Sequence, residues 1–402
     1  MSWTGPLAAL KLPAFRWYSL GNFSSLTGTW AQRTVLFWLA WELTGSTTIL
    51  GLMALLDLMP AVIMAPIGGS LADRFDRLRV AQRVQYIGVV PPVALLLLSG
   101  LDMLTLPMLL LGAVATGMLN GLDHPIRLVL VGSITPREMI PQAVGLNSLT
   151  FNLSRTLGPM IGGWCIASDA YALVFALNIC SFLTFAAVLR QIEPASREGQ
   201  SSNAQQKPVG WRGLLPGMGR LEKLSLAYYG VIAFCLRPVM DLLPAFASTL
   251  ARPGPEAVAA FTLLSSAVGL GAMVGAFIAS ARRGRGMTIT SGLGAAASVL
   301  LFVLSAQVWL AALAVAMASA GIMANAISTQ VAIQIGVAEE LRGKAMALYA
   351  LVLRVLPALG AVLTGHLLAQ PNGFQWLFWL CAAVAISGAT LWRLLRRLPD
   401  EA

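Results

Sequence analysis

Long apolar runs divide this chain, and they restrict its fold more than any other feature. About twelve stretches of roughly 20 residues are predominantly apolar, and short polar turns separate them. A transmembrane helix needs ~20 apolar residues to cross a bilayer, and it satisfies its backbone hydrogen bonds internally. We therefore predict an all-α integral membrane protein with spans near residues 17–43, 47–72, 80–99, 104–131, 142–167, 170–190, 223–249, 257–281, 287–305, 308–335, 344–368 and 373–396.

The composition excludes a soluble globular protein. Only 11% of the 402 residues are charged and 57% are hydrophobic, whereas soluble domains average about 25% charged residues. The first apolar run is too long for a cleavable signal peptide and is followed at once by another span. All four cysteines fall inside predicted spans without CxxC spacing, and no cluster around the two histidines has metal-ligand spacing. We expect no metal and no other cofactor.

The net charge of +10 reports the orientation of the chain in the membrane. If the N-terminus is cytoplasmic, nearly all basic loop residues lie on the inner side, and Arg252 is the exception. This distribution follows the positive-inside rule, which argues against a nucleic-acid partner. An even number of spans returns the C-terminus to the cytoplasm. We predict a multi-pass protein of a bacterial-type inner membrane.

A polar stretch and an internal repeat divide the chain in two. Residues 191–221 include SREGQSSNAQQKP and indicate a cytoplasmic linker between bundles of six helices, 1–190 and 222–402. The segment 137–163 aligns with 339–365, so that Gly158 matches Gly360 and Gly163 matches Gly365. Two parallel repeats of this kind are typical of one class of secondary transporter.

A charge-dense turn, GGSLADRFDRLR, spans residues 68–79 between the second and third predicted spans. It resembles the signature loop of the major facilitator superfamily, although Asp76 stands where that pattern has glycine. The resemblance implies two bundles around a central cavity that opens alternately to each side, and a cytoplasmic gate in which Asp73 meets the helix starting near 342–344. The alternative is an ordinary basic turn. The matching residues that we single out are Gly69, Asp73, Arg74 and Arg77.

A glycine-rich pattern, SRTLGPMIGG, lies in the fifth predicted span. It resembles the pattern of antiporter-type facilitators, which implies export by antiport. Glycines one turn apart also make a smooth face for close helix contact, and proline can kink a helix. Antiport and plain helix packing are both open readings of Gly158, Pro159, Gly162 and Gly163.

A third element, DHPIR, ends the fourth predicted span, and AVGLNS follows it at residues 143–148. Together these elements resemble the branch of the superfamily that contains the bacterial enterobactin (siderophore) exporters. We expect Asp123, Pro125 and Arg127 to act with the Asp73 loop at the cytoplasmic gate.

Charged residues inside the spans are the best pointers to function, because each is costly if it faces lipid. Arg33 and Asp57 both lie about 15 Å from the outer end of their helices, so they can pair near the midplane. Arg237 and Asp241 lie one turn apart, and Pro238 between them indicates a broken helix. Each pair is either a proton-coupling site or a structural ion pair, and the sequence leaves both open.

Two further arginines, Arg155 and Arg354, also fall near mid-depth, and for them we favour a cavity role. Four arginines against two carboxylates make a net-positive cavity, which favours an anionic substrate. Trp30 is either an interfacial anchor or a ring that stacks on a planar substrate. We include Trp30 and Gln32 among the candidates for the substrate cavity.

The sequence thus predicts a secondary transporter, and the favoured prediction is a proton-coupled exporter of small amphipathic or anionic, siderophore- or drug-like molecules. It contains no ATP-binding loop and no catalytic triad spacing, so we do not expect an enzyme. The fold works as a monomer. The alternatives are an uptake carrier or lipid transporter of the same fold, and a non-transporting membrane scaffold or sensor.

Overall fold

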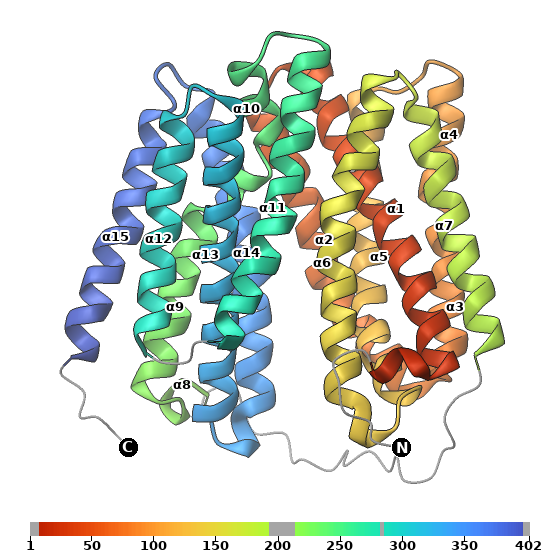
Figure 1. Cartoon of the computed structure of the whole chain (residues 1–402), viewed down its shortest axis with the longest axis horizontal. Helices are drawn as coiled ribbons and strands as arrows, with labels where there is room; N and C mark the ends of the chain where they lie inside the picture. Colours follow the sequence, from red (N-terminus) through yellow and green to blue (C-terminus); the bar gives the residue numbers. More distant parts are fainter. Residues whose placement is uncertain (1–7, 193–213, 282–284, 397–402) are drawn as a thin grey trace. The chain divides into compact units, whose positions relative to one another are not determined.

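The computed structural model describes residues 8–192, 214–281 and 285–396, and the residues in these ranges form helices and turns without a strand (Figure 1). Most of the predicted linker, residues 193–213, lies outside the described residues. The helices are α1 (Pro13–Thr44), α2 (Thr47–Arg74), α3 (Arg77–Gly88), α4 (Val90–Gly100), α5 (Leu106–Ser133), α6 (Ile140–Ala167), α7 (Tyr171–Gln191), α8 (Leu214–Gly217), α9 (Arg220–Cys235), α10 (Leu243–Leu250), α11 (Pro255–Ala281), α12 (Arg285–Leu304), α13 (Val308–Gly336), α14 (Glu339–Leu368) and α15 (Gln375–Leu395), with short 3₁₀ helices η1 (Ala8–Lys11), η2 (Arg137–Met139) and η4 (Arg237–Met240).

The predicted spans correspond to these helices. Within the described residues, nine helical segments are long and apolar enough to cross a membrane, with α3 and α4 counted as one. A tenth span consists of α9 with η4, followed by α10. The other two predicted spans are α1 and α6, which have 32 and 28 residues. At ~1.5 Å per residue both exceed the ~30 Å hydrocarbon core, but polar residues interrupt their apolar runs.

The tenth span is broken where the sequence predicts a break. α9 ends at Cys235, the 3₁₀ helix η4 begins at Arg237, and α10 leaves at an angle of 51°. Pro238 has no backbone N–H, so the regular hydrogen-bond ladder cannot pass through it. The break at Pro238 is confirmed, and it places Arg237 and Asp241 on a short irregular segment between two helices.

The chain forms two compact units. Unit 1 comprises Met1–Gly45, Leu56–Gln200 and Arg252–Ser266, and unit 2 comprises Ser46–Leu55, Ser201–Ala251 and Ala267–Ala402. These bounds differ from a simple division at the linker, because α2 and α11 each contribute one end to each unit. In unit 2, for example, the Thr47 hydroxyl donates a hydrogen bond to the Gly365 carbonyl at 2.7 Å.

Each unit has its own apolar core. In unit 1, α1 packs along α5, α6 and α7 (Figure 1), and large buried side chains such as Phe15, Tyr18 and Phe185 fill the space at one end. In unit 2, Tyr229 of α9 stacks on Tyr349 of α14 with 5.7 Å between ring centroids. In unit 1 the candidate residues Trp30, Gln32 and Arg33 lie on α1, and in unit 2 Arg237 and Asp241 follow directly after α9.

Candidate functional site

The two charges predicted to meet near the midplane of unit 1 form an ion pair. Arg33 Nε of α1 donates to Asp57 Oδ2 of α2 at 2.8 Å. Asp57 is buried, whereas 18% of the Arg33 side chain is exposed to solvent. Gly117 of α5 lies against the backbone of Asp57, where a side chain would collide with the Asp57 carbonyl. Three helices therefore fix the position of this carboxylate.

Two guanidinium groups lie close to the ring of Trp30. The Cζ atoms of Arg33 and of Arg155 are each 5.6 Å from the centroid of the Trp30 ring, which is within cation–π range. Phe151 of α6 meets the same ring edge-on, with 6.0 Å between centroids. Trp30, Arg33 and Arg155 are all partly exposed. We call Trp30, Arg33, Asp57 and Arg155 the Trp30 cluster; its net charge is positive.

Gln32 has a different environment from its neighbours. It is 2% exposed, its Oε1 accepts a hydrogen bond from Asn178 of α7 at 2.8 Å, and its Nε2 donates to Thr116 of α5 at 3.4 Å. A side chain with both ends occupied inside the unit has little left to offer a ligand. In unit 1 this residue bridges three helices, and it does not belong to the Trp30 cluster.

The glycine pattern of α6 packs on α1. A Cβ atom on Gly158 would lie 3.0 Å from the Ala31 nitrogen and closer still to Trp30 Cβ, and one on Gly162 would lie 2.8 Å from the Ala31 carbonyl oxygen. Ser154, one turn earlier, accepts a hydrogen bond from Thr27 at 3.1 Å. These three positions form one smooth face of α6, so the packing reading of the pattern has direct geometric support.

The rest of the pattern has separate roles. Gly163 faces α11, where any side chain would collide with Thr262 of unit 1. Pro159 is buried, and α6 continues through it to Ala167 without a break. The glycines thus allow α6 to touch α1 on one side and the first half of α11 on the other.

Two substitutions in α6 should have opposite effects on stability. Gly158→Ala should lower the free energy of unfolding by about 1–3 kcal/mol, because the added methyl group forces α1 and α6 apart. Gly145→Ala should raise it by about 0.5–1 kcal/mol, because a Cβ there meets nothing within 4 Å and alanine favours the helix. Thermal unfolding in one detergent compares the two variants. Equal effects would contradict the close contact at Gly158.

Arg127 lies in a buried polar network instead of at an exposed gate. Arg127 and Asp123 are 7% and 8% exposed and form an ion pair one turn apart on α5. The guanidinium also donates to Asn22, to Ser25 Oγ at 2.9 Å and to Gln85 Oε1 at 3.2 Å, and it lies over the Phe185 ring at 4.8 Å. We call Asn22, Ser25, Gln85, Asp123 and Arg127 the Arg127 network.

The network is hydrogen-bonded internally and also reaches α6, because Asn22 Nδ2 donates to Asn147 Oδ1 at 3.1 Å. Gln85 Nε2 donates to Asp123 Oδ1 at 2.9 Å, the Ser25 hydroxyl donates to Gln85 Oε1 at 3.1 Å, and Tyr18 donates to the Arg127 carbonyl at 3.4 Å. It thus connects α1, α3, α5 and α6. A fully satisfied buried network makes helices rigid relative to one another. This position suits a brace within unit 1 better than the moving gate that the sequence predicts. Pro125 lies on α5 beside it, and Gly68 of α2 packs against Pro125 Cγ.

The Asp73 loop ends α2 and starts α3. Asp73 and Arg74 are exposed, and Arg77 is the first residue of α3. Asp76, which departs from the family pattern, caps α3 by accepting a hydrogen bond from the Arg79 backbone at 2.9 Å. The expected partner of Asp73 belongs to α14, in the other unit, so the gate stays a prediction.

The two adjacent glycines at the end of α2 have different surroundings in unit 1. A Cβ on Gly69 would meet nothing within 4 Å, whereas one on the preceding residue, Gly68, would collide with the Leu122 carbonyl of α5. Within unit 1 it is Gly68 that allows the close approach of α2 to α5, and the role of Gly69 in the signature loop stays a prediction. One residue shifts the side chain by about 100° around a helix, so adjacent glycines face different neighbours.

Unit 2 carries the second predicted ion pair. Arg237 Nη1 lies 3.3 Å from Asp241 Oδ2, and the Asp241 side chain is 1% exposed against 24% for Arg237. Arg354 is half-buried on α14, one turn before Pro357. A break in a helix and an ion pair coincide here, as at many transporter sites.

The comparisons with known proteins identify the family. The sequence model of the transmembrane secretion effector family, a group of the major facilitator superfamily, matches residues 4–402. The chain belongs to the major facilitator superfamily. This facilitator is 26% identical over 216 residues to an uncharacterized MFS-type transporter of Bacillus subtilis, covering 54% of this chain and 50% of that protein. It is 22% identical over 170 residues to the staphyloferrin A transporter of Staphylococcus aureus, covering 42% and 43%.

A longer match is to the enterobactin exporter of Shigella boydii, with 27% identity over 311 residues, 75% of this chain and 72% of that one. The alignments span about half the length, or less, of the first two relatives. Solved structures share the fold of the facilitator. A POT family transporter in complex with 5-aminolevulinic acid superposes with a TM-score of 0.76 at 11% identity, covering 96% and 97% of the two chains. A D-xylose–proton symporter gives 0.73 at 14% identity, covering 94% and 97%.

Sequence reasoning missed the polar partners inside unit 1 of the facilitator. Asn22, Ser25 and Gln85 hold Arg127, and Asn178 holds Gln32. One signal was present in the sequence. Asn22, Ser25 and Gln32 follow one another at spacings of three and seven residues, which puts them on one face of α1. A polar stripe of this kind within an apolar run indicates a buried helix contact.

Proposed function

We propose that this facilitator is a secondary exporter of small amphipathic or anionic, siderophore-like molecules. The observation that carries the proposal is the Trp30 cluster: a partly exposed ring close to two guanidinium groups, beside a buried carboxylate, midway along α1. Aromatic faces bind planar groups, and guanidinium groups bind carboxylates and phenolates. A ligand that is flat and negatively charged satisfies both.

Two relatives support the substrate class and the direction of transport. They are named an enterobactin exporter and a staphyloferrin A transporter, and the family model is described as a secretion effector. The proton gradient is the proposed energy source, with Asp57 and Asp241 as proton sites. Loop charges support cytoplasmic N- and C-termini.

The working scheme is alternating access by a monomer with two six-helix repeats, residues 1–190 and 222–402, joined by a cytoplasmic linker. In this scheme Asp73, Arg74 and Arg77 act at the cytoplasmic gate. The Arg127 network braces the first repeat. Arg237 and Arg354 add positive charge that attracts an anionic substrate.

The charge preference can be tested with matched substrates. We expect inverted vesicles that contain the protein to accumulate a catecholate or carboxylate compound faster than a cationic analogue of the same size. Arg155→Gln should lower transport of the anion by about tenfold or more, because a hydrogen bond to a charged group contributes ~1.5–3 kcal/mol. The wild type and the Arg155→Gln variant should transport the cationic analogue at equal rates.

The control is Arg83→Gln, which removes an exposed arginine of α3. It changes the net charge equally but leaves the Trp30 cluster intact, so anion transport should not change. A clear preference of the wild type for the cation would refute the proposed substrate class. Uptake of neither compound, by a protein that remains folded, would favour the scaffold alternative.

A further inference from the structure

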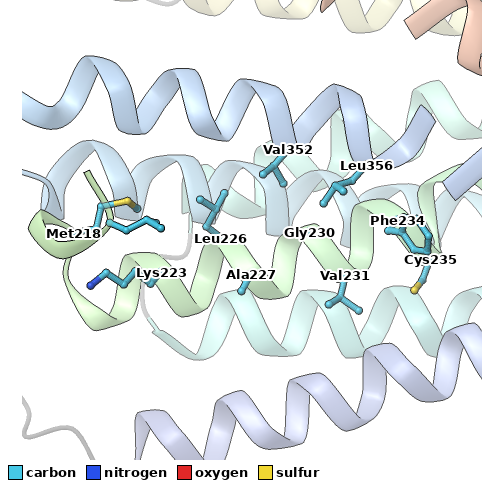
Figure 2. A pocket seen from close by; sticks show the side chains of 11 residues that line it. Met218, Lys223, Leu226, Ala227, Gly230, Val231, Phe234, Cys235, Val352 and Leu356 are labelled. Carbon is cyan, nitrogen blue, oxygen red and sulfur yellow. The ribbon is translucent and has the colours of Figure 1, made fainter. Parts of the chain in front are cut away.

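A long apolar groove lies on the surface of unit 2, along the line where α9 meets α14. Its volume is about 550 Å³. Val352 and Leu356 of α14 point toward α9, and the lining continues over α9 to Ala227 and Val231, which lie on the side of that helix turned away from α14 (Figure 2). At its floor the two helices come close, because a Cβ atom on Gly230 would already lie 3.0 Å from Leu356 Cδ1.

The groove occupies the face of α9 that the rest of unit 2 leaves uncovered. Tyr229 and Ala233 belong to the buried core with α13. The Tyr228 hydroxyl packs against Gly292 of α12 and Gly388 of α15. Ala227 lies on the remaining side and is exposed. Apolar side chains therefore line an open channel on a helix whose other faces are fully packed.

One end of the groove carries a positive charge. Figure 2 shows Lys223 and Met218 at one end and Phe234 with Cys235 at the other. Lys223 is the one charged residue of the lining, and none of the described carboxylates forms an ion pair with it. The adjacent Glu222 is buried against Gly336 of α13 and does not line the groove. Arg220, at the start of α9, is exposed on the same end of the helix.

The length of the groove matches one leaflet of a membrane. Phe234 follows Lys223 by eleven residues, which corresponds to ~16 Å along α9 at ~1.5 Å per residue. Half of the ~30 Å hydrocarbon core is about 15 Å. A molecule with one charged end and an apolar part as deep as a leaflet fits this shape.

We propose that the groove binds one acyl chain of an anionic phospholipid, and that Lys223 binds its phosphate with support from Arg220. Basic pockets between helices at the cytoplasmic surface are suited to anionic headgroups, and burying an acyl chain in an apolar channel is favourable for each methylene group. The groove offers no carboxylate to the ammonium group of a zwitterionic lipid. That the bound lipid lies in the cytoplasmic leaflet rests on the orientation proposed above.

Native mass spectrometry of the purified full chain tests this site. The protein is mixed in detergent with equal amounts of phosphatidylglycerol and phosphatidylcholine that carry identical chains. We expect the wild type to retain phosphatidylglycerol about fivefold more than phosphatidylcholine, the factor expected for one basic residue near a lipid headgroup. Lys223→Ala should abolish this preference, and Lys223→Arg should keep it. Ala227→Trp, which fills the groove, should remove both lipid adducts.

Two controls match these changes. Lys11→Ala removes an exposed lysine of unit 1, and Ala389→Trp adds the same bulk to an exposed position of α15 outside the groove; neither should change lipid retention. Equal retention of the two lipids by the wild type, or a preference that survives Lys223→Ala, would overturn the proposal. A wild-type dimer that becomes monomeric in Ala227→Trp would also overturn it, because the groove would then be an interface between two copies of the chain. Because the assay needs neither transport nor a membrane, its failure is separate from any failure of the proposed function or orientation.

Discussion

Arg127→Ala should lower the free energy of unfolding by about 3–5 kcal/mol, the usual result of removing one partner of a buried ion pair. The substitution leaves the Asp123 carboxylate buried and takes a donor from Asn22, Ser25 and Gln85 at the same time. Each acceptor that loses its partner adds a desolvation cost. Thermal unfolding in one detergent, followed by tryptophan fluorescence, measures the change.

A control and a double variant show whether the loss of stability is specific to the Arg127 network or follows from removing any arginine. Arg83→Ala, at an exposed position of α3, should change the free energy of unfolding by no more than about 0.5 kcal/mol. Asp123→Leu combined with Arg127→Met should recover much of the loss, because apolar residues of similar volume can replace a buried ion pair. If Arg127→Ala were as stable as Arg83→Ala, the brace assigned to Arg127 would be wrong.

Asp57→Asn should abolish coupling of transport to the proton gradient. If one proton is exchanged per substrate, a gradient of one pH unit supports an accumulation ratio of about ten, because one pH unit corresponds to ~1.36 kcal/mol. Asparagine cannot carry the proton, so the ratio should fall to about one while substrate still equilibrates. Accumulation in inverted vesicles measures this ratio. The same experiment on Asp241→Asn tests the pair in unit 2.

The matched control for coupling is Asp102→Asn. Asp102 is exposed in the turn after α4 and has φ +55°, a conformation that asparagine adopts readily. Accumulation by this variant should equal that of the wild type. A second control, Arg33→Gln with Asp57→Asn, removes both charges and leaves no unpaired arginine. If accumulation persists in the double variant, then Asp57 pairs with Arg33 for stability alone, and the proton is carried elsewhere.

The features that could be predicted from the sequence depend on distance along a helix. The depth of Arg33 and Asp57 follows from the rise per residue, and the structure brings them to 2.8 Å. Arg237 and Asp241 can pair because they lie one turn apart, and Pro238 favours a break in its helix because it has no backbone donor. These inferences need no knowledge of how helices are rotated about their axes.

The features that could not be predicted depend on that rotation. Gly68 and Gly69 are equivalent in the sequence, but only Gly68 faces α5. Arg127 was expected at a gate because the DHPIR element resembles a family element at the end of the fourth span. Its partners other than Asp123 are neutral side chains of α1 and α3, and neutral side chains carry no charge signal that links them to an arginine. The N-cap at Asp76 could have been predicted, because aspartate before a helix is a common cap. Asp76 was instead interpreted only as a departure from the glycine of the family pattern.

The Arg127 network also has a consequence for how the protein enters the membrane during synthesis. A charged side chain within a membrane-spanning helix opposes the insertion of that helix into the bilayer. Every hydrogen-bond acceptor that the structure gives the Arg127 guanidinium comes from Asn22, Ser25, Gln85 or Asp123, all of which precede it in the chain. When α5 leaves the ribosome, α1 and α3 have already been synthesised and can receive its charges. The order of the helices in the sequence is therefore also a workable order of insertion, and moving α1 behind α5 by circular permutation should impair biogenesis even if the finished fold is unchanged.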